Sequence, residues 1–301
     1  MNVRIEQYTA EKLSSLLPHP KVDANKYSRG KLTIVGGASV YPGAVCLSSV
    51  AAQLMGAGYV EVFCSSESVP IVQSWRPSVV ARDWETFDVS KLSASHHFGA
   101  CLVGPGIDAG DAWQLSTVLS IVEKAQVPLI VDGGAISALS TVAGIKLASQ
   151  RNIHSVPLVI TPHLGEATYM ADASGICVPD TDSDMDKYAS FSAKLSDAFN
   201  AVVLLKGPVS FISSPGTPSC TPLVFCMKQG TSSLAKAGSG DVLAGMVGSL
   251  LAQGLEDIDA CVLGATLHAE AGRAAQAKLG DISVCAEDVA FNIPDAILCC
   301  S

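Results

Sequence analysis

The hydrophobic positions of this chain fall into short continuous runs, separated by longer stretches rich in alanine, leucine and glycine. Runs at residues 31–35, 59–64, 100–103, 128–131, 157–160 and 201–205 are almost entirely apolar, and each predicts a buried strand. Intervening stretches such as 44–56 and 242–251 have the composition of helices. Because strands hidden on both faces alternate with helices, the pattern predicts an α/β fold with a mostly parallel central sheet and helices on both faces.

Chemically distinctive residues stand directly after several of these strands. Gly106 lies in the turn after the third strand, Asp132 follows the fourth, His163 the fifth and Lys206 the sixth. Ligands of open α/β sheets bind at the carboxyl edge of the strands, so we expect a site there. No linker or change of composition divides the chain, and the polar stretch 180–186 is expected to start a surface helix. We therefore expect one domain spanning residues 1–301.

Composition narrows the classes of function. The 301 residues include 19 Lys and Arg against 28 Asp and Glu, a formal net charge of −9, which argues against binding to nucleic acid or anionic membranes. No uninterrupted apolar run is long enough to cross a bilayer, and the first residues lack the apolar core of a signal peptide. We expect a cytoplasmic protein whose ten cysteines are reduced thiols rather than disulfides or zinc ligands.

The segment 237–241 (AGSGD) has the small residues of a tight turn, and a helix is predicted directly after it. Unpaired amides at a helix start attract anions, and glycines allow a close approach of a phosphate. Asp241 has two interpretations at this position. It is either the N-cap of the helix or a carboxylate that takes the proton from a hydroxyl as that oxygen attacks a phosphoryl group.

Two common nucleotide motifs are missing. The sequence contains no GxxxxGK[ST] loop, and the glycines after the first strand do not have GxGxxG spacing. A hydride-transferring dehydrogenase is therefore poorly supported.

The motifs taken together resemble a known family. Gly-Ser-Gly-Asp at 238–241 resembles the GxGD motif of the ribokinase-like superfamily, and Thr-Pro-His-Leu-Gly-Glu at 161–166 narrows the match. With Gly-Gly at 36–37, Tyr-Pro-Gly-Ala at 41–44, Gly-Pro-Gly at 104–106 and Lys-Gly at 206–207, the chain resembles the ADP-dependent NAD(P)H-hydrate dehydratase family, in family order from Arg29 to His268. The resemblance implies a ribokinase-like fold. Because only 30 residues precede the first strand, we expect no N-terminal epimerase domain of the kind found in bifunctional members.

The resemblance also implies a reaction. ADP would phosphorylate the C6 hydroxyl of hydrated NADH or NADPH (NADHX or NADPHX), giving AMP, and phosphate would then be eliminated to restore NAD(P)H. Phosphate leaves far more readily than hydroxide, which gives the phosphorylation its purpose. The implied cofactor is Mg²⁺, ADP is the phosphoryl-donor co-substrate, and the implied assembly is a homotetramer, with no nucleic-acid or membrane partner.

The same resemblance assigns roles to residues. Asp241 is the implied catalytic base and also contacts the substrate. The implied substrate-binding residues are Ala44, Gly106 and His163, and the implied nucleotide-binding residues are Lys206, Gly207, Pro208, Val209, Ser210 and Gly240. Glu166 would order Mg²⁺ waters or phosphate, or serve only as a helix-start carboxylate. Asp132 would either contact ligand or cap the next helix. The metal ligands are not given by the sequence.

Charge and motif differences leave alternatives open. Both ligands are polyanions and the chain is acidic, so we expect a locally positive site built from Lys206, Lys236, the Gly240 amide and Mg²⁺. Ala237 and Ser239 stand where the family usually has Gly and Thr, which leaves the nucleotide preference open. A small-molecule kinase of the same superfamily and a non-catalytic nucleotide-binding regulator are the alternative functions. Neither the NADHX versus NADPHX preference nor the strictness for ADP over ATP follows from the sequence.

Overall fold

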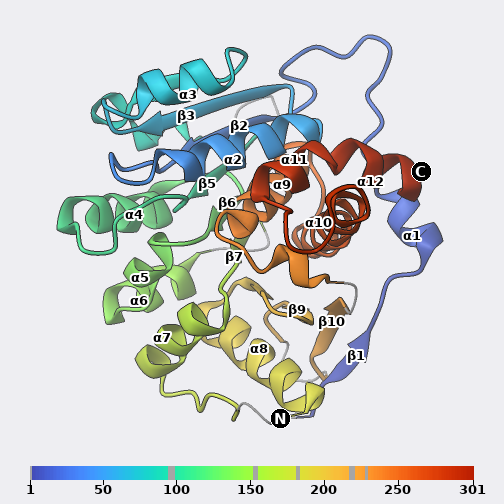
Figure 1. Cartoon of the computed structure of the whole chain (residues 1–301). Helices are drawn as coiled ribbons and strands as arrows, with labels where there is room; N and C mark the ends of the chain where they lie inside the picture. The colour runs from blue at the N-terminus through green and yellow to red at the C-terminus, as the bar shows by residue number, and fades with distance from the viewer. Residues whose placement is uncertain (1, 94–98, 152–154, 181–183, 217–220, 228–229) are drawn as a thin grey trace.

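A computed structural model describes residues 2–93, 99–151, 155–180, 184–216, 221–227 and 230–301. Within these residues ten strands form one sheet that runs through the middle of the molecule (Figure 1). In spatial order the strands are β1 (Arg4–Glu6), β10 (Leu223–Met227), β9 (Ser210–Ser213), β8 (Val202–Leu205), β7 (Leu158–Ile160), β6 (Leu129–Val131), β5 (Gly99–Val103), β2 (Lys31–Val35), β3 (Tyr59–Cys64) and β4 (Val80–Asp83).

The sheet is mostly parallel, as the sequence predicted. The six predicted strands are confirmed as β2, β3, β5, β6, β7 and β8. Only β9 runs antiparallel to its neighbours β8 and β10. The expectation that every predicted strand leads into a helix is therefore wrong for β8, because the chain turns back after Leu205 and forms β9.

Helices cover both faces of the sheet, because side chains along each strand alternate between the two faces. Leu32 and Ile34 of β2 belong to one buried cluster, and Val35 belongs to the other. The first cluster is covered by α2 (Pro42–Leu54), α3 (Val69–Trp75), α9 (Ser239–Ala252), α10 (Asp257–Leu279), α11 (Ala286–Phe291) and α12 (Ile293–Cys300). The second is covered by α4 (Ala112–Lys124), α5 (Ala135–Leu139), α6 (Val142–Gln150), α7 (Leu164–Ser174) and α8 (Met185–Phe199).

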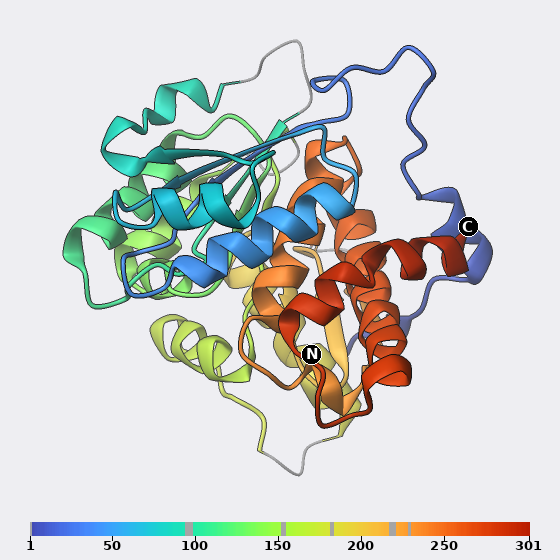
Figure 2. The ribbon, with the colours of Figure 1, turned by 45° about the horizontal axis from the view of Figure 1, so that its top comes forward.

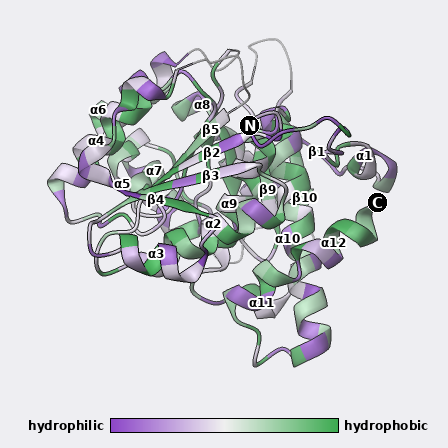
Figure 3. Ribbon diagram, turned by 90° about the horizontal axis from the view of Figure 1, so that it is seen from above, coloured by the Kyte–Doolittle hydropathy of each residue, from purple (hydrophilic) through white to green (hydrophobic). Residues whose placement is uncertain are grey.

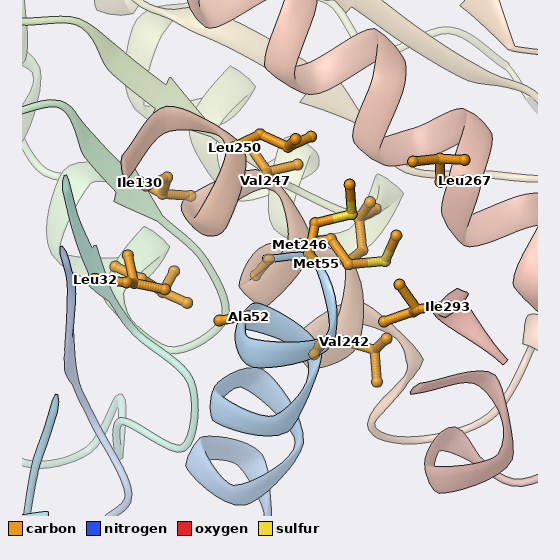
Figure 4. Close-up of a cluster of buried hydrophobic side chains, with 14 of the residues drawn as sticks. Leu32, Ala52, Met55, Ile130, Val242, Met246, Val247, Leu250, Leu267 and Ile293 are labelled. Atoms are coloured by element: carbon orange, nitrogen blue, oxygen red, sulfur yellow. The ribbon is translucent and has the colours of Figure 1, made fainter. Parts of the chain in front are cut away.

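The first layer holds the best-buried helix of the fold. Side chains of α9 and α2 pack against Leu32 and Ile130 of the sheet, and Leu267 of α10 and Ile293 of α12 lie on the other side of the same cluster (Figure 4). Hydrophobic residues gather along α9 and α10 near the centre of the molecule (Figure 3). Figure 2 shows α2, α11 and α12 side by side on the front of this layer. The burial of α9 matters because the AGSGD segment, residues 237–241, leads into its first turn.

Smaller features complete the chain. Helix α1 (Ala10–Ser15) packs beside α12, and single 3₁₀ turns lie at Trp84–Thr86, Val89–Lys91 and Ser232–Leu234.

Asp184 caps α8 by accepting a hydrogen bond from the Lys187 amide, so the end of the polar stretch 180–186 does start a helix. Residues 181–183 of that stretch lie outside the described residues. The thiols of Cys46, Cys64, Cys101 and Cys261 are free and buried, whereas those of Cys177, Cys285 and Cys299 are free and exposed, so not all cysteines are core residues. No helix in the described ranges is both long and apolar enough to cross a membrane.

Candidate active site

The turn at the start of α9 is the centre of the site. Gly238 is its N-cap and has a φ of +89°, and a Cβ there would lie 2.5 Å from Cδ1 of Leu47, so only glycine fits. Ser239 and Gly240 are the first two helical residues, and Asp241 is the third. The interpretation of Asp241 as the N-cap is therefore wrong. Its carboxyl group lies in the first turn, beside backbone amides that have no partner within the helix.

The ends of β6, β7 and β8 form a buried hydrogen-bonded group. Asp132 is 3% exposed, and its Oδ1 accepts hydrogen bonds from Thr161 Oγ1 at 2.6 Å and from Lys206 Nζ at 2.7 Å. Helix α5 is capped by Gly134, so the expectation that Asp132 caps the next helix is wrong. Asp132 instead fixes the ammonium group of Lys206.

Lys206 connects this group to the α9 turn. Its Nζ lies 4.0 Å from Glu166 Oε2 and 3.2 Å from the position that a Cβ on Gly240 would occupy. Burial lowers the pKa of Lys206, but the charges of Asp132, Glu166 and Asp241 outweigh burial and the pKa is raised. The ammonium is therefore a permanent cation placed against the turn.

The pKa of the Asp241 carboxyl lies near neutral pH. Burial raises its pKa from 3.8 to about 7, the negative charges of Asp132 and Glu166 push it the same way, and Lys206 opposes them. A carboxyl group that titrates near neutral pH can accept a proton from a hydroxyl and later release it. A pKa shifted toward neutral pH by burial and neighbouring charges is typical of acid–base sites.

The side chains alone do not supply the expected positive site. The side chains gathered here are three carboxyl groups (Asp132, Glu166 and Asp241) and one ammonium (Lys206), so they do not make a positive site. The other expected cation, Lys236, is exposed and donates to the carbonyl oxygen of Ile282. Positive potential at the turn therefore comes from Lys206 and from the helix amides.

His163 and Glu166 form the start of α7. The Glu166 side chain accepts from the His163 amide at 2.9 Å, while Nδ1 of His163 accepts from the Glu166 amide at 3.2 Å. Glu166 thus has the helix-start role that was one of its two interpretations. The His163 side chain is 60% exposed and leaves its ring accessible, so its contact with substrate stays a prediction.

The two small residues predicted to contact substrate lie next to each other. A Cβ on Gly106 would be 3.2 Å from Cβ of Ala44 and 2.5 Å from the carbonyl oxygen of Tyr41. The turn that holds Gly106 also contacts the end of β6. A Cβ on Gly104 would lie only 1.7 Å from the carbonyl oxygen of Asp132. Backbone atoms of the strand-end turns therefore lie in close contact at Gly104 and Gly106.

The predicted nucleotide loop is the turn between β8 and β9. Gly207 and Pro208 are exposed, Val209 is half-buried, and Ser210 is the first residue of β9. Lys206 at its start is bridged to His163 through parallel backbone pairing. The structure thus places Lys206 and Gly240 together, while nucleotide contacts of the exposed turn stay predictions.

Sequence reasoning gave no role to two residues of the site. Thr161 carries the hydroxyl that bonds Asp132, and the signal for it was its place as the first polar residue after β7. His268 is buried in α10 and hydrogen-bonds Ser239 of the turn. Its signal was an imidazole within a helical run of small and apolar residues, where burial requires a partner.

The described residues contain no cluster of three or more His, Cys, Asp or Glu side chains arranged to hold a metal ion. A preformed protein cage is therefore absent from this part of the chain. Magnesium sites in phosphoryl-transfer enzymes commonly use one or two carboxylates, with substrate phosphates and water as the other ligands.

Comparison with known proteins agrees with the geometry. A family model described as NAD(P)H-hydrate dehydratase matches residues 32–295. The chain is 31% identical to an ADP-dependent (S)-NAD(P)H-hydrate dehydratase of Neisseria meningitidis, over 83% of this chain and 78% of that protein. It is 32% identical to the bifunctional NAD(P)H-hydrate repair enzyme Nnr of Mycobacterium leprae, over 96% of this chain and 55% of that protein. The chain thus spans about half the length of the bifunctional relatives that it matches.

Solved structures show the same fold. An ADP/ATP-dependent NAD(P)H-hydrate dehydratase of Bacillus subtilis, co-crystallised with ATP and Mg²⁺, superposes with a TM-score of 0.79 at 21% identity, over 100% of both chains. A ribokinase-like superfamily protein of Enterococcus faecalis gives a TM-score of 0.76 at 21% identity, over 99% of this chain and 96% of that one. The fold is therefore ribokinase-like, with a mostly parallel sheet between two helical layers. Since the family model spans nearly the whole chain, the protein belongs to the NAD(P)H-hydrate dehydratase family.

Proposed function

We propose that this chain is an ADP-dependent (S)-NAD(P)H-hydrate dehydratase, a lyase that repairs damaged nicotinamide cofactor. One observation carries the proposal: Asp241 lies in the first turn of α9, beside amides that have no partner within the helix, and its pKa of about 7 suits a general base at neutral pH. Family membership supplies the substrate class.

In the proposed first step Asp241 accepts the proton of the C6 hydroxyl of NADHX or NADPHX. The hydroxyl oxygen forms a bond to the β-phosphorus of ADP, and the bond from that phosphorus to the bridging oxygen breaks to release AMP. The Gly240 amide and the Lys206 ammonium hold the negative charge of the moving phosphoryl group. In the second step the C6–O bond breaks, phosphate leaves, and a proton is lost from C5, which restores the double bond of NAD(P)H.

Magnesium fits this site as a partner of the nucleotide. The carboxyl groups outnumber the ammonium three to one, so a polyphosphate needs a counter-ion to enter. Bound Mg²⁺ would neutralise phosphate charge, with Glu166 as the carboxylate that orders its waters. Ala44, Gly106 and His163 would contact the hydrated dinucleotide, and residues 206–210 the adenine nucleotide.

The test is the recovery of near-ultraviolet absorbance from hydrated NADH, run with ADP and with ATP. We expect recovery by the native protein and a loss of about 10²- to 10⁴-fold in Asp241→Asn, the usual contribution of a general base. Asp257→Asn is the matched control, because Asp257 is a half-buried carboxyl in the first turn of α10 and its pKa is also raised by burial. Full activity of Asp241→Asn would overturn the base assignment, and no recovery by the native protein with either nucleotide would overturn the function.

The remaining proposals concern the whole molecule. We infer one ribokinase-like domain, a cytoplasmic location and a homotetramer. An apolar groove of about 630 Å³ between α2, α3 and α11 supports association, because it exposes Ile71 and Trp75 to solvent. Light scattering of the purified chain measures the assembly directly.

A further inference from the structure

His268 is a buried titratable residue that the proposed chemistry does not use. It lies in α10 between Leu267 and Ala269, and it is 7% exposed. Its Nε2 is 3.2 Å from Oγ of Ser239, the first helical residue of α9. A hydrogen bond thus connects α10 to the turn that carries the proposed base.

The turn has a particular need for such a bond. Helices usually begin with a side chain that bonds the first amides, but Gly238 caps α9 and has no side chain to do so. Ser239 is 6% exposed, and its hydroxyl contacts the buried imidazole of His268. The bond to His268 therefore ties this glycine-rich turn to a second helix by a side-chain contact.

The imidazole acts here as a neutral group. Burial lowers the pKa of His268 to about 4, a hydrogen bond with the Ser239 backbone opposes this, and the charge of Lys206 adds to the lowering. A neutral imidazole has one donor and one acceptor nitrogen, so it can hold a hydroxyl without bringing charge to the site. The contact is consequently the same at every pH at which Asp241 titrates.

We propose that His268 is a positioning residue: through Ser239 it fixes the Gly238–Asp241 turn so that the Gly240 amide and the Asp241 carboxyl face the bound nucleotide and substrate. The inference rests on the proposed function for its catalytic consequence. Its structural part, the ordering of an anion-binding turn, does not.

The consequence of losing the contact follows from the geometry. Removing either partner leaves a buried polar group unsatisfied and frees a turn that contains two glycines. Small displacements of supporting groups commonly reduce activity by about 10- to 100-fold. We expect a reduction of this size in kcat for His268→Ala and for Ser239→Ala, together with weaker binding of the nucleotide.

The experiment compares these two variants, their double variant and Ser239→Thr. Nucleotide affinity is measured by calorimetry with MgADP, kcat and KM with hydrated NADH, and folding by thermal unfolding. The double variant should be no worse than the more impaired single variant, because both changes break one contact. Ser239→Thr keeps the hydroxyl and should retain activity.

Thr266→Val is the matched control. Thr266 is a buried residue of the same helix, and its hydroxyl bonds the Val262 carbonyl rather than the turn. It should change the unfolding temperature without changing kcat. The inference is overturned if His268→Ala behaves like Thr266→Val, or if the two single effects multiply in the double variant. If the native protein binds MgADP but does not restore NADH, while His268→Ala weakens that binding, the proposed function fails and the positioning role stands.

Discussion

The proposed base should destabilise the folded protein, and replacing it should raise stability in a pH-dependent way. In the unfolded chain Asp241 ionises near its ordinary pKa of 3.8, whereas in the fold it ionises near 7. The contribution of the protonated carboxyl to the unfolding free energy is fully present below about pH 4, and it is lost as the pH rises through about 7. Above that range the native protein holds a carboxylate that burial and its acidic neighbours disfavour.

The magnitude follows from the same shift. A rise in pKa from 3.8 to about 7 corresponds to about 4 kcal/mol at 1.36 kcal/mol for each pH unit. Asp241 keeps some contact with water and loses an attraction to Lys206 when it is replaced, so we expect about 1–2 kcal/mol to be recovered. Asp241→Asn should therefore be more stable than the native protein by this amount at about pH 8, and no more stable at about pH 4.

Urea unfolding of ligand-free protein at several pH values measures this difference. The informative quantity is the change in unfolding free energy between Asp241→Asn and the native chain, followed from acid to alkaline pH. A variant that is less stable at about pH 8, or a difference that does not depend on pH, would refute the argued burial of charge. The enzyme assay of the same variant shows whether stability is gained at the expense of activity.

Two further predictions concern the same edge of the sheet. The rate kcat/KM should rise with pH through about 7 as Asp241 ionises, and Lys206→Met should move this rise to higher pH, because removing a cation raises the pKa of the carboxyl. A pH–rate profile measures the midpoint, and a shift to lower pH would contradict the assigned role of Lys206. Gly104→Ala should lower the unfolding free energy by about 2–4 kcal/mol, because Gly104 has a φ of +128° and the new Cβ would meet the Asp132 carbonyl oxygen. Gly43→Ala, where a Cβ meets open space, is its control in urea unfolding, and equal stability of the two variants would contradict the packing argument.

The central strands could be predicted because strands that are buried on both faces appear in the sequence as continuous hydrophobic runs. Strands β1 and β9 could not be predicted in this way. Strand β9 begins and ends with serine, and β1 has three residues with charged ends, so neither has a hydrophobic pattern that distinguishes it from a loop. Strand β1 also pairs with a partner distant in the sequence, β10, which periodicity does not reveal.

The site was predicted in part for a similar reason. The rule that ligands meet the carboxyl ends of parallel strands pointed to Asp132 and Lys206, whose side chains lie together in the structure. It did not reveal that the two form an ion pair, since that depends on side-chain directions at two separate strand ends. Asp241 was a candidate N-cap of α9 because aspartate is common at that position. The N-cap is instead Gly238, whose positive φ cannot be inferred from the pattern of residue types.

Strand β1 has a consequence for how the protein is made. Among the described residues it pairs only with β10, with Arg4 opposite Leu223, so more than two hundred residues must be synthesised before this partner exists. Contacts of such long separation form late, because closing a long loop costs entropy before any bond is gained. During synthesis, strands β2 to β8 can assemble before β10 exists. Strand β1 therefore joins the sheet late in folding.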